Sequence, residues 1–304
     1  MGIADNPKYR RINDDIAAGR FYDSLQHVLS ASQRAVIAKR YSEAFELLHH
    51  FAEVYIRAGE YAQSLELMKE YMNIATNSGI EFTEANIDQV ISFFCTVKES
   101  LSSAQEPLAG PLAKDAILTK SVAIADSALE INPHPKLSLC LGKHHMDEGQ
   151  LTDAQTYLIQ AQDMEALFKL LDYWGSLVQE HERPFVFLRC ILIQLATGDF
   201  SSAKCLLLML NQDFESSNTV PIPLQMAYIF TELFENPDYL LYKVACKVYK
   251  PVIDADPNFP RLVHHVRERL FPGHEDPSDP YQVDPTLPQG TGNPFASLLS
   301  SLVS

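Results

Sequence analysis

The sequence predicts an all-α protein built as an irregular solenoid of antiparallel helices. First, one line of sequence recurs every 20 residues near the N-terminus, as AAGRFYDSLQHV (17–28), AKRYSEAFELL (38–48) and RAGEYAQSLELM (57–68). Second, apolar residues elsewhere recur at i, i+3, i+4 and i+7, which is typical of amphipathic helices. Third, no convincing alternation of apolar and polar residues indicates a series of strands.

The recurring line reads as a turn followed by the start of a helix. Numbered from the turn residue, position zero is Gly19, Lys39, Gly59, Gly149 and Gly198. A ring or leucine follows at plus two, a small residue at plus five and an apolar residue at plus nine. This order predicts a helix that begins after the turn. The small residue at plus five leaves room for a neighbouring helix, and the apolar residue at plus nine is buried in the core. It matches the opening of the second helix in a tetratricopeptide-type hairpin, although a consensus repeat has about 34 residues. The fold is therefore tetratricopeptide-like but irregular.

Further helices are predicted over 85–101, 115–131, 223–235 and 239–253. We assign residues 1–14 to an N-terminal arm and residues 15–271 to the solenoid, with an N-terminal half of about 15–133 and a C-terminal half of about 134–271. The segment 211–223 is polar and contains proline, so we expect a long loop there that could form a small hairpin.

The character of the chain changes after Phe271. Residues 272–294 hold six of the 18 prolines, three glycines and four acidic residues, which predicts a flexible tail without a core. Residues 295–304 then place Phe295, Leu298, Leu299, Leu302 and Val303 on one stripe, which predicts a short amphipathic helix. Ten residues do not hold a helix alone in water, so this segment docks on its own chain, docks on a partner or stays disordered.

Composition excludes several classes of protein. A net charge of −15 disfavours general nucleic-acid binding. Residues 1–60 hold eight Lys/Arg and eight Asp/Glu, so a neutral end on an acidic chain indicates two partner surfaces, or chance clustering. Five scattered cysteines among apolar neighbours indicate a reducing compartment. We expect no signal peptide and no membrane span, and we assign the protein to the cytosol.

No catalytic motif is present. The sequence lacks HExxH, GxxxxGK[ST], GxGxxG and GxSxG, and its acidic residues stand singly. Cys140, His144 and Glu148 have the best metal-like spacing, but zinc would need a fourth group from elsewhere, and the alternative is a solvated helix face with one buried thiol. We therefore predict a protein that is not an enzyme and carries no cofactor and no metal.

The polar positions of the repeats indicate a contact surface. If each 20-residue unit is a single antiparallel helix, Gln26 and Glu66 share one face and Glu46 lies opposite. Tyr22 is a large ring where the other copies have smaller residues, and it lies one turn from Gln26. We expect this ring to be exposed as part of a contact patch, the alternative being a ring packed on the preceding helix. The basic residues expected beside it are Arg34, Lys39 and Arg40.

Several segments taken together resemble a known family. These are the recurring N-terminal line and the segments 132–163, 183–207, 221–235 and 249–273, followed by the terminal LLSSLVS. Their order and spacing resemble the family of the fourth component of the Golgi-to-ER-traffic machinery. This family belongs to the guided entry of tail-anchored proteins pathway, as a subunit of the transmembrane-domain recognition complex. The resemblance covers most of residues 15–273.

The resemblance implies an adaptor that promotes delivery of tail-anchored proteins to the endoplasmic reticulum. Its N-terminal helices would bind the targeting ATPase, and its C-terminal helices would bind a subunit with a ubiquitin-like domain. The candidate ATPase-facing residues are Phe21, Tyr22, Gln26, Arg34, Lys39, Arg40 and Glu66, and Phe21 also fits the core pattern. The candidates for the partner subunit are Phe214, Val220, Ile222, Leu224 and Tyr228. The alternative is a generic tetratricopeptide-like co-chaperone or scaffold, which would need basic residues at fixed concave positions of longer repeats.

Overall fold

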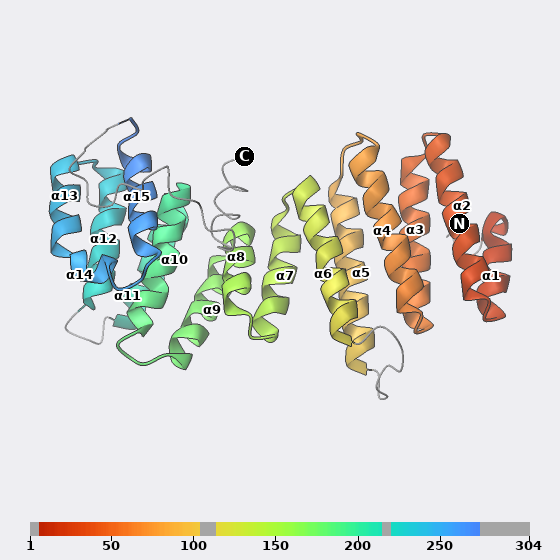
Figure 1. Cartoon of the computed structure of the whole chain (residues 1–304), viewed down its shortest axis with the longest axis horizontal. Helices are drawn as coiled ribbons and strands as arrows, with labels where there is room; N and C mark the ends of the chain where they lie inside the picture. Colours follow the sequence, from red (N-terminus) through yellow and green to blue (C-terminus); the bar gives the residue numbers. More distant parts are fainter. Residues whose placement is uncertain (1–5, 104–113, 215–219, 274–304) are drawn as a thin grey trace. The chain divides into compact units, whose positions relative to one another are not determined.

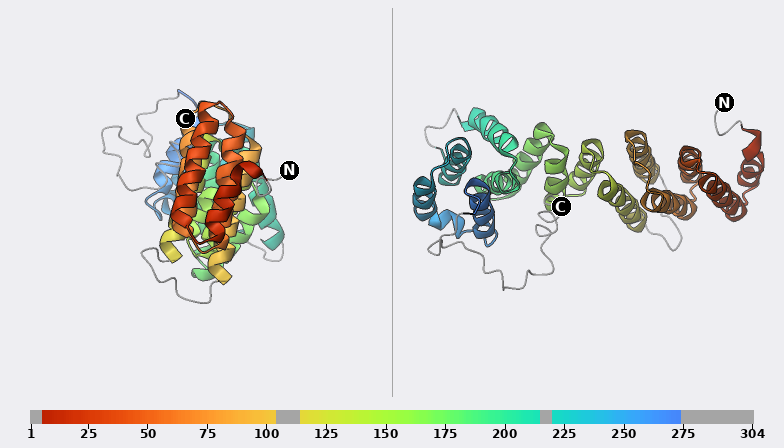
Figure 2. Two further views of the ribbon diagram at one scale, coloured as in Figure 1. Left: turned by 90° about the vertical axis from the view of Figure 1, so that its right-hand side faces the viewer. Right: turned by 90° about the horizontal axis from the view of Figure 1, so that it is seen from above.

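The computed structural model describes residues 6–103, 114–214 and 220–273, and all regular elements in these ranges are helices (Figures 1 and 2). The predicted all-α class is therefore confirmed. The chain divides into two compact units, Met1–Leu141 and Gly142–Ser304, with the boundary inside helix α7 (Pro135–Asp147). No helix in the described ranges is long and apolar enough to cross a membrane.

The N-terminal unit consists of two layers of antiparallel helices. After a 3₁₀ turn, η2 (Pro7–Tyr9), its helices are α1 (Arg10–Ala17), α2 (Phe21–Ile37), α3 (Tyr41–Arg57), α4 (Tyr61–Asn77), α5 (Glu84–Ser103) and α6 (Lys114–Ile131). Helix α2 packs on both α3 and α4, α3 on α5, and α4 on α6. Alternate helices therefore share a layer, as the 20-residue spacing predicts, with α2, α4 and α6 in one layer and α3 and α5 in the other (Figure 2).

Each residue at position zero ends a helix in the left-handed conformation. The four glycines have φ between 72° and 88°, and Lys39 has φ of 57°. At the first turn the amide of Gly19 donates to the carbonyl of Ile16 (2.9 Å) and that of Arg20 to the carbonyl of Asp15 (2.8 Å), which is the Schellman motif. The same pair of bonds recurs at the other four turns. Lys39 adopts this conformation without the freedom of glycine, at a cost of about 1 kcal/mol.

The small residues at plus five lie where helices approach each other. Ser24, Ala44, Ser64, Ala154 and Ala203 are all at most 1% exposed. The hydroxyl of Ser64 on α4 donates to the backbone carbonyl of Ala52 on α3 (2.8 Å), a contact that a large side chain would prevent. The apolar residues at plus nine are buried as predicted: Val28, Leu48, Met68, Leu158 and Leu207. At plus two, Tyr61 is buried, whereas the other four residues are half-buried. All five are the first residues of their helices, where the packing between helices begins.

The C-terminal unit is arranged around one central helix. Its helices are α8 (Leu151–Ala161), α9 (Met164–Leu177), α10 (Arg183–Thr197), α11 (Phe200–Phe214), α12 (Ile222–Glu235), α13 (Tyr239–Val248), α14 (Lys250–Ile253) and α15 (Phe259–Leu270). Helix α10 packs on α9, α11, α12 and α15. Residues 190–196 of α10 are buried on all sides, which explains why "CILIQLA" shows no polar face.

Two predicted boundaries differ from the structure, and the remaining predicted segments lie outside the described residues. Helix α1 starts at Arg10, inside the segment 1–14 that we assigned to an arm. The predicted loop 211–223 is too long, because α11 continues to Phe214 and α12 begins at Ile222. The possible hairpin falls largely on residues 215–219, and the tail and terminal helix on 274–304; both ranges lie outside the described residues.

Candidate functional site

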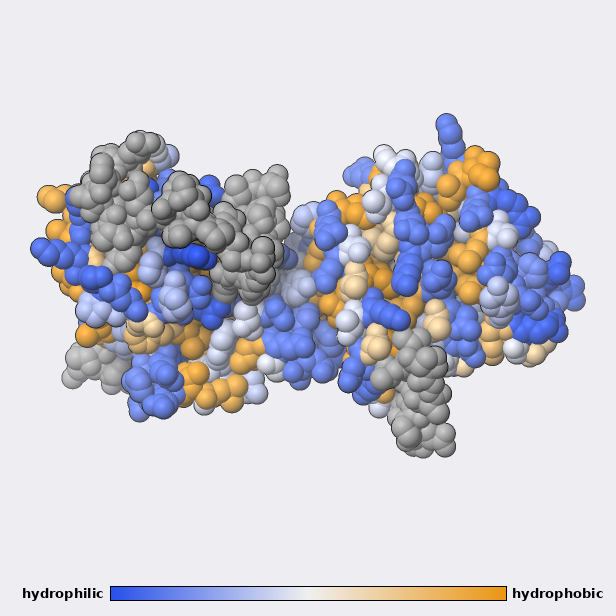
Figure 3. Space-filling model, in the orientation of Figure 1, coloured by the Kyte–Doolittle hydropathy of each residue, from blue (hydrophilic) through white to orange (hydrophobic). Residues whose placement is uncertain are grey.

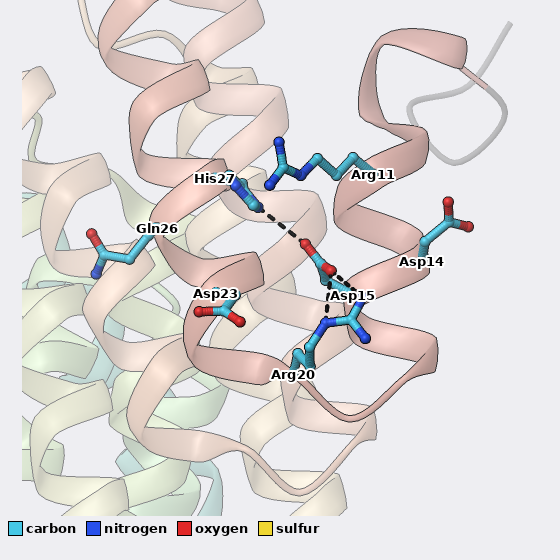
Figure 4. A pocket seen from close by; sticks show the side chains of 7 residues that line it. All are labelled: Arg11, Asp14, Asp15, Arg20, Asp23, Gln26 and His27. Atoms are coloured by element: carbon cyan, nitrogen blue, oxygen red, sulfur yellow. Dashed lines mark hydrogen bonds and ion pairs between the residues drawn. The ribbon is translucent and has the colours of Figure 1, made fainter.

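A polar depression opens between α1 and α2 in the N-terminal unit (Figure 4). It has a volume of about 570 Å³ and is lined by Arg11, Asp14, Asp15, Arg20, Asp23, Gln26 and His27. Arg11, Asp14 and Asp15 come from α1 and Arg20 from the connecting turn, whereas Asp23, Gln26 and His27 come from the first turns of α2. The Schellman turn at Gly19 brings these three segments together.

Asp15 organises this depression. Its carboxylate accepts hydrogen bonds from Arg20 Nε (3.0 Å) and Nη2 (2.5 Å), and its second oxygen lies 3.1 Å from His27 Nδ1. The hydrogen bonds from Arg20 hold the pKa of Asp15 below its usual value, and His27 adds to this effect. The ionised carboxylate therefore fixes the turn that carries Arg20 and leads into Phe21 and Tyr22. Sequence reasoning missed this group, because only the closed turn brings Asp15 and Arg20 together.

Three of the predicted residues lie on one face at one end of the α2–α4 layer. The ring of Tyr22 is 70% exposed, so the predicted exposure is correct and the alternative of a packed ring is wrong. Gln26 lies one turn later on the same helix and is exposed. Glu66 is also exposed, five residues after the start of α4, as Gln26 is five residues after the start of α2. Because α2 and α4 run parallel and pack on each other, Gln26 and Glu66 stand at the same height. We call Tyr22, Gln26 and Glu66 the N-terminal surface.

Phe21 has a structural position instead. Its ring is half-buried and packs edge-on against Tyr55 of α3, with 6.3 Å between ring centroids. This contact agrees with the core pattern in which Phe21 stands.

The basic residues are not beside Tyr22, which corrects the predicted patch. Arg34 follows Tyr22 by about 18 Å along the axis of α2, at 1.5 Å per residue, and Lys39 and Arg40 lie in the turn beyond. Arg40 Nη1 pairs with Glu43 Oε2 (2.6 Å), and Glu43 also accepts from Lys8 and from the hydroxyl of Tyr9. The hydrogen bond from Lys8 is the main cause that lowers the pKa of Glu43. The cation that lies near Tyr22 in the chain is Arg20, two residues before it.

Ile37 is an apolar neighbour of this basic group that the sequence analysis missed. Its side chain is 83% exposed on the last turn of α2. The sequence did contain a signal for this exposure: Ile37 directly follows Val36 and lies outside the apolar stripe of α2. Arg34, Ile37, Lys39 and Arg40 therefore form a separate basic rim at the far end of α2.

The second predicted group is only partly accessible. Val220 is 36% and Ile222 is 60% exposed, where the chain enters α12. Leu224 is 1% exposed and belongs to the core, so its assignment to a contact surface is wrong. Tyr228 is half-buried, and its hydroxyl lies 3.4 Å from the carbonyl of Leu207 on α11. Phe214 ends α11, and its side chain lies outside the described residues.

The cysteine and histidine candidates on α7 have other contacts. His144 is 4% exposed rather than on a solvated face, and His145 stacks on Tyr157 with 5.1 Å between centroids. Cys140 Sγ lies 4.0 Å from Cys95 Sγ of α5. No group of His, Cys, Asp or Glu in the described ranges has an arrangement that could hold a metal ion.

We expect Cys95 to be the most reactive thiol of the chain. The hydrogen bond from Cys140 lowers the pKa of Cys95 to about 7, whereas burial raises the pKa of Cys190 to about 12. The alkylation rate of Cys95 by iodoacetamide should therefore rise with pH through about 7, as its thiolate forms. At pH 7, Cys140→Ala should slow this reaction by roughly tenfold, since the thiolate loses its donor.

The control for this experiment is Cys205→Ala, which removes a half-buried thiol on α11. Peptide mass spectrometry measures alkylation site by site. An equal rate for Cys95 in the wild type and in Cys140→Ala would contradict the assignment.

Comparison with known proteins gives a consistent result. The family model described as "Golgi to ER traffic protein 4" matches residues 38–302. The "Golgi to ER traffic protein 4 homolog" of Dictyostelium discoideum is 21% identical over 286 residues, covering 94% of this chain and 85% of the relative. "Protein GET4" of Arabidopsis thaliana is 21% identical over 281 residues, covering 84% of this chain and 87% of the relative. The crystal structure of C. therm. Get4 superposes with a TM-score of 0.72 at 15% identity, covering 96% of both chains.

Proposed function

The chain belongs to the Golgi to ER traffic protein 4 family, whose members are non-catalytic adaptors in the targeting of tail-anchored proteins, and from this premise we propose how it binds its partners. Its N-terminal helices bind the cytosolic targeting ATPase, and its C-terminal helices bind a subunit with a ubiquitin-like domain. In this role the protein works in the cytosol and brings the two partners together, so that a tail-anchored protein passes to the ATPase for delivery to the endoplasmic reticulum.

The exposed ring of Tyr22 is the observation that carries the ATPase site. An aromatic side chain that is 70% exposed contributes little to the fold, whereas such rings often anchor protein interfaces. Gln26 and Glu66 add exposed polar groups to the same face. The ion-paired turn through Asp15 and Arg20 holds the backbone just before the ring, so the ring is presented from a fixed position.

The basic rim supports a second, electrostatic contribution to the same interaction. Arg34, Lys39 and Arg40 are exposed, and Lys39 holds a left-handed conformation that is unfavourable for lysine. Such strain is often retained where a side chain has a role in binding. Exposed charges of this kind raise association rates and lose their effect at high salt.

The entrance to α12 supports the second site. Ile222 is 60% exposed and Val220 36% exposed, although both are aliphatic, and only Pro221 separates them in the chain. Their exposure leaves an apolar surface that a partner would remove from water. We place the contact with the ubiquitin-like-domain subunit at these two residues.

Binding measurements with each purified partner test both assignments at once. Tyr22→Ala should weaken binding of the ATPase by about 30-fold, the loss typical of an aromatic anchor worth about 2 kcal/mol. Glu66→Lys should weaken it by about tenfold, and both variants should bind the ubiquitin-like-domain subunit normally. Ile222→Asp should have the opposite pattern. Isothermal titration calorimetry gives the dissociation constants.

Two matched variants serve as controls. Tyr173→Ala removes another exposed tyrosine, 45% exposed on α9 of the C-terminal unit. Glu46→Lys makes the same charge reversal as Glu66→Lys, but on α3 in the other layer. Unchanged affinity for the ATPase in Tyr22→Ala and Glu66→Lys, or equal losses in Glu46→Lys, would refute the N-terminal surface.

A further inference from the structure

Helix α13 carries an apolar face that no other described segment covers. Leu240 is 72%, Leu241 44%, Val244 49% and Val248 62% exposed. The opposite face of the same helix is fully used in the core through Tyr242, Ala245 and Cys246. In Figure 3, several apolar side chains show on the surface at the left of the view, where Figure 1 draws α13. A contiguous exposed patch of this kind indicates a docking surface.

The described chain ends beside this helix. The ring of Phe271 packs edge-on against Tyr239 and Tyr242 of α13, with centroid distances of 5.2 Å and 5.9 Å. The described residues end two positions later, at Gly273. The remaining segment, residues 274–304, is therefore attached beside α13, at the side of the helix where Tyr239 and Tyr242 lie, and it must pass around the helix to reach the exposed face.

The sequence of that remaining segment contains a matching apolar stripe. Phe295, Leu298, Leu299, Leu302 and Val303 recur at helical spacing in the last ten residues. A helix of this length forms in water only when its apolar face packs on something. A coil with the length of residues 274–294 spans about 25 Å, whereas α13, with 10 residues, is about 15 Å long. The stripe can thus reach the whole face.

Charge also favours this pairing. Residues 274–294 contain Glu275, Asp276, Asp279 and Asp284 and no lysine or arginine. Helix α13 and the start of α14 present three exposed lysines, Lys243, Lys247 and Lys250, of which Lys250 also pairs with Asp254 Oδ2 (2.6 Å). The acidic connection is therefore attracted to the helix on which the stripe would dock.

We propose that residues 295–304 dock on α13 of the same chain as a short amphipathic helix that covers Leu240, Leu241, Val244 and Val248. The connection keeps the segment at a millimolar effective concentration, so even a weak contact is occupied. Any partner that uses α13 must first displace this segment. The inference is independent of the ATPase and subunit sites proposed above.

Photo-crosslinking in the full-length protein tests where the segment docks. With p-benzoylphenylalanine in place of Val244, we expect crosslinks to peptides that contain residues 295–303. The same probe in place of Leu177, which is 59% exposed on α9, should give none. A mixture of isotopically light and heavy protein separates crosslinks within one chain from those between chains. Crosslinks only between chains, or none to residues 295–303, would overturn the proposal.

Hydrogen exchange of α13 gives a second, independent readout. Leu298→Asp with Leu302→Asp places charges on the stripe and should make the α13 amides exchange about tenfold faster. Ser300→Asp with Ser301→Asp adds the same charge to the same segment off the stripe, and should leave exchange unchanged. Equal exchange of α13 in the two double variants would also overturn the proposal. Neither double variant changes a residue of the described core, so both proteins are expected to fold.

Discussion

Tyr71→Ala is expected to lower the free energy of unfolding of the N-terminal unit by about 3–5 kcal/mol, the range for deleting a large buried ring. Tyr71 is fully buried on α4. Its ring contacts Phe45 of α3 at 4.5 Å and Phe82, just before α5, at 6.3 Å between centroids. Its hydroxyl accepts from Asn86 Nδ2 (2.8 Å) and donates to Gln89 Oε1 (2.7 Å). One side chain thus joins α3, α4 and α5, and its loss leaves a cavity and an unpaired buried amide.

The measurement uses a property of the C-terminal unit. The sequence has one tryptophan, Trp174 in α9. Tryptophan fluorescence therefore follows unfolding of the C-terminal unit, while far-ultraviolet circular dichroism follows both units. In urea, Tyr71→Ala should shift part of the dichroism transition to lower denaturant and leave the fluorescence transition in place.

The matched variant for this experiment is Tyr71→Phe, which keeps the ring and removes only the hydroxyl. It should cost about 1–3 kcal/mol, because the buried Asn86 amide loses its acceptor. A loss in Tyr71→Ala no larger than that in Tyr71→Phe would show that ring packing at this point contributes little.

Gly142→Val is expected to destabilise the C-terminal unit by about 2–3 kcal/mol, the upper part of the range for overpacking. A Cβ at Gly142 in α7 would lie 2.7 Å from Cδ2 and 2.8 Å from Cγ of Leu158 in α8, and 3.3 Å from its backbone nitrogen. Leu158 is 1% exposed, so it has no free space into which it could move. Here the fluorescence of Trp174 should shift to lower urea, the reverse of the pattern for Tyr71→Ala.

A double-mutant cycle isolates the cause of this loss. Leu158→Ala alone opens a cavity and should cost about 2–5 kcal/mol. If the clash with Leu158 is the reason, the double variant should be more stable than the sum of the two losses predicts, by at least about 1 kcal/mol. Additive losses would mean that valine acts at this position through helix propensity alone.

Much of the fold could be predicted because one local signal repeats. The left-handed residue at position zero, the small residue at plus five and the apolar residue at plus nine each have a local physical cause, and the structure places each as expected. The prediction even holds at Lys39, where the expected glycine is missing but the turn is kept. The long loop was misjudged because the polar end of α11 resembles a loop in composition, and no local rule indicates that Asn211–Phe214 continue the helix.

Less of the candidate sites could be predicted, because surfaces depend on three-dimensional packing. The co-facial pair Gln26 and Glu66 followed from the repeat spacing. The basic residues were placed beside Tyr22 because they are near it in the chain, although the length of α2 separates them. Leu224, which we expected on a contact surface, is buried, whereas the apolar face of α13, which we did not single out, is exposed. Both stand in helices whose apolar residues outnumber the positions of one buried stripe, and only the packing of the unit decides which side chains are buried.

The two units have different freedom to change in length during evolution. In the N-terminal unit the main contacts of α2, α3 and α4 reach only the next helix and the one after it, so a whole hairpin can be gained or lost with its neighbours' surfaces intact. In the C-terminal unit α15 returns across the sequence to α10, and Arg269 Nε donates to the backbone carbonyl of Ala196 (3.3 Å). Losing a hairpin there would leave α10 without its covering helix, so we expect duplication or loss of a hairpin to cost more stability in the second unit than in the first.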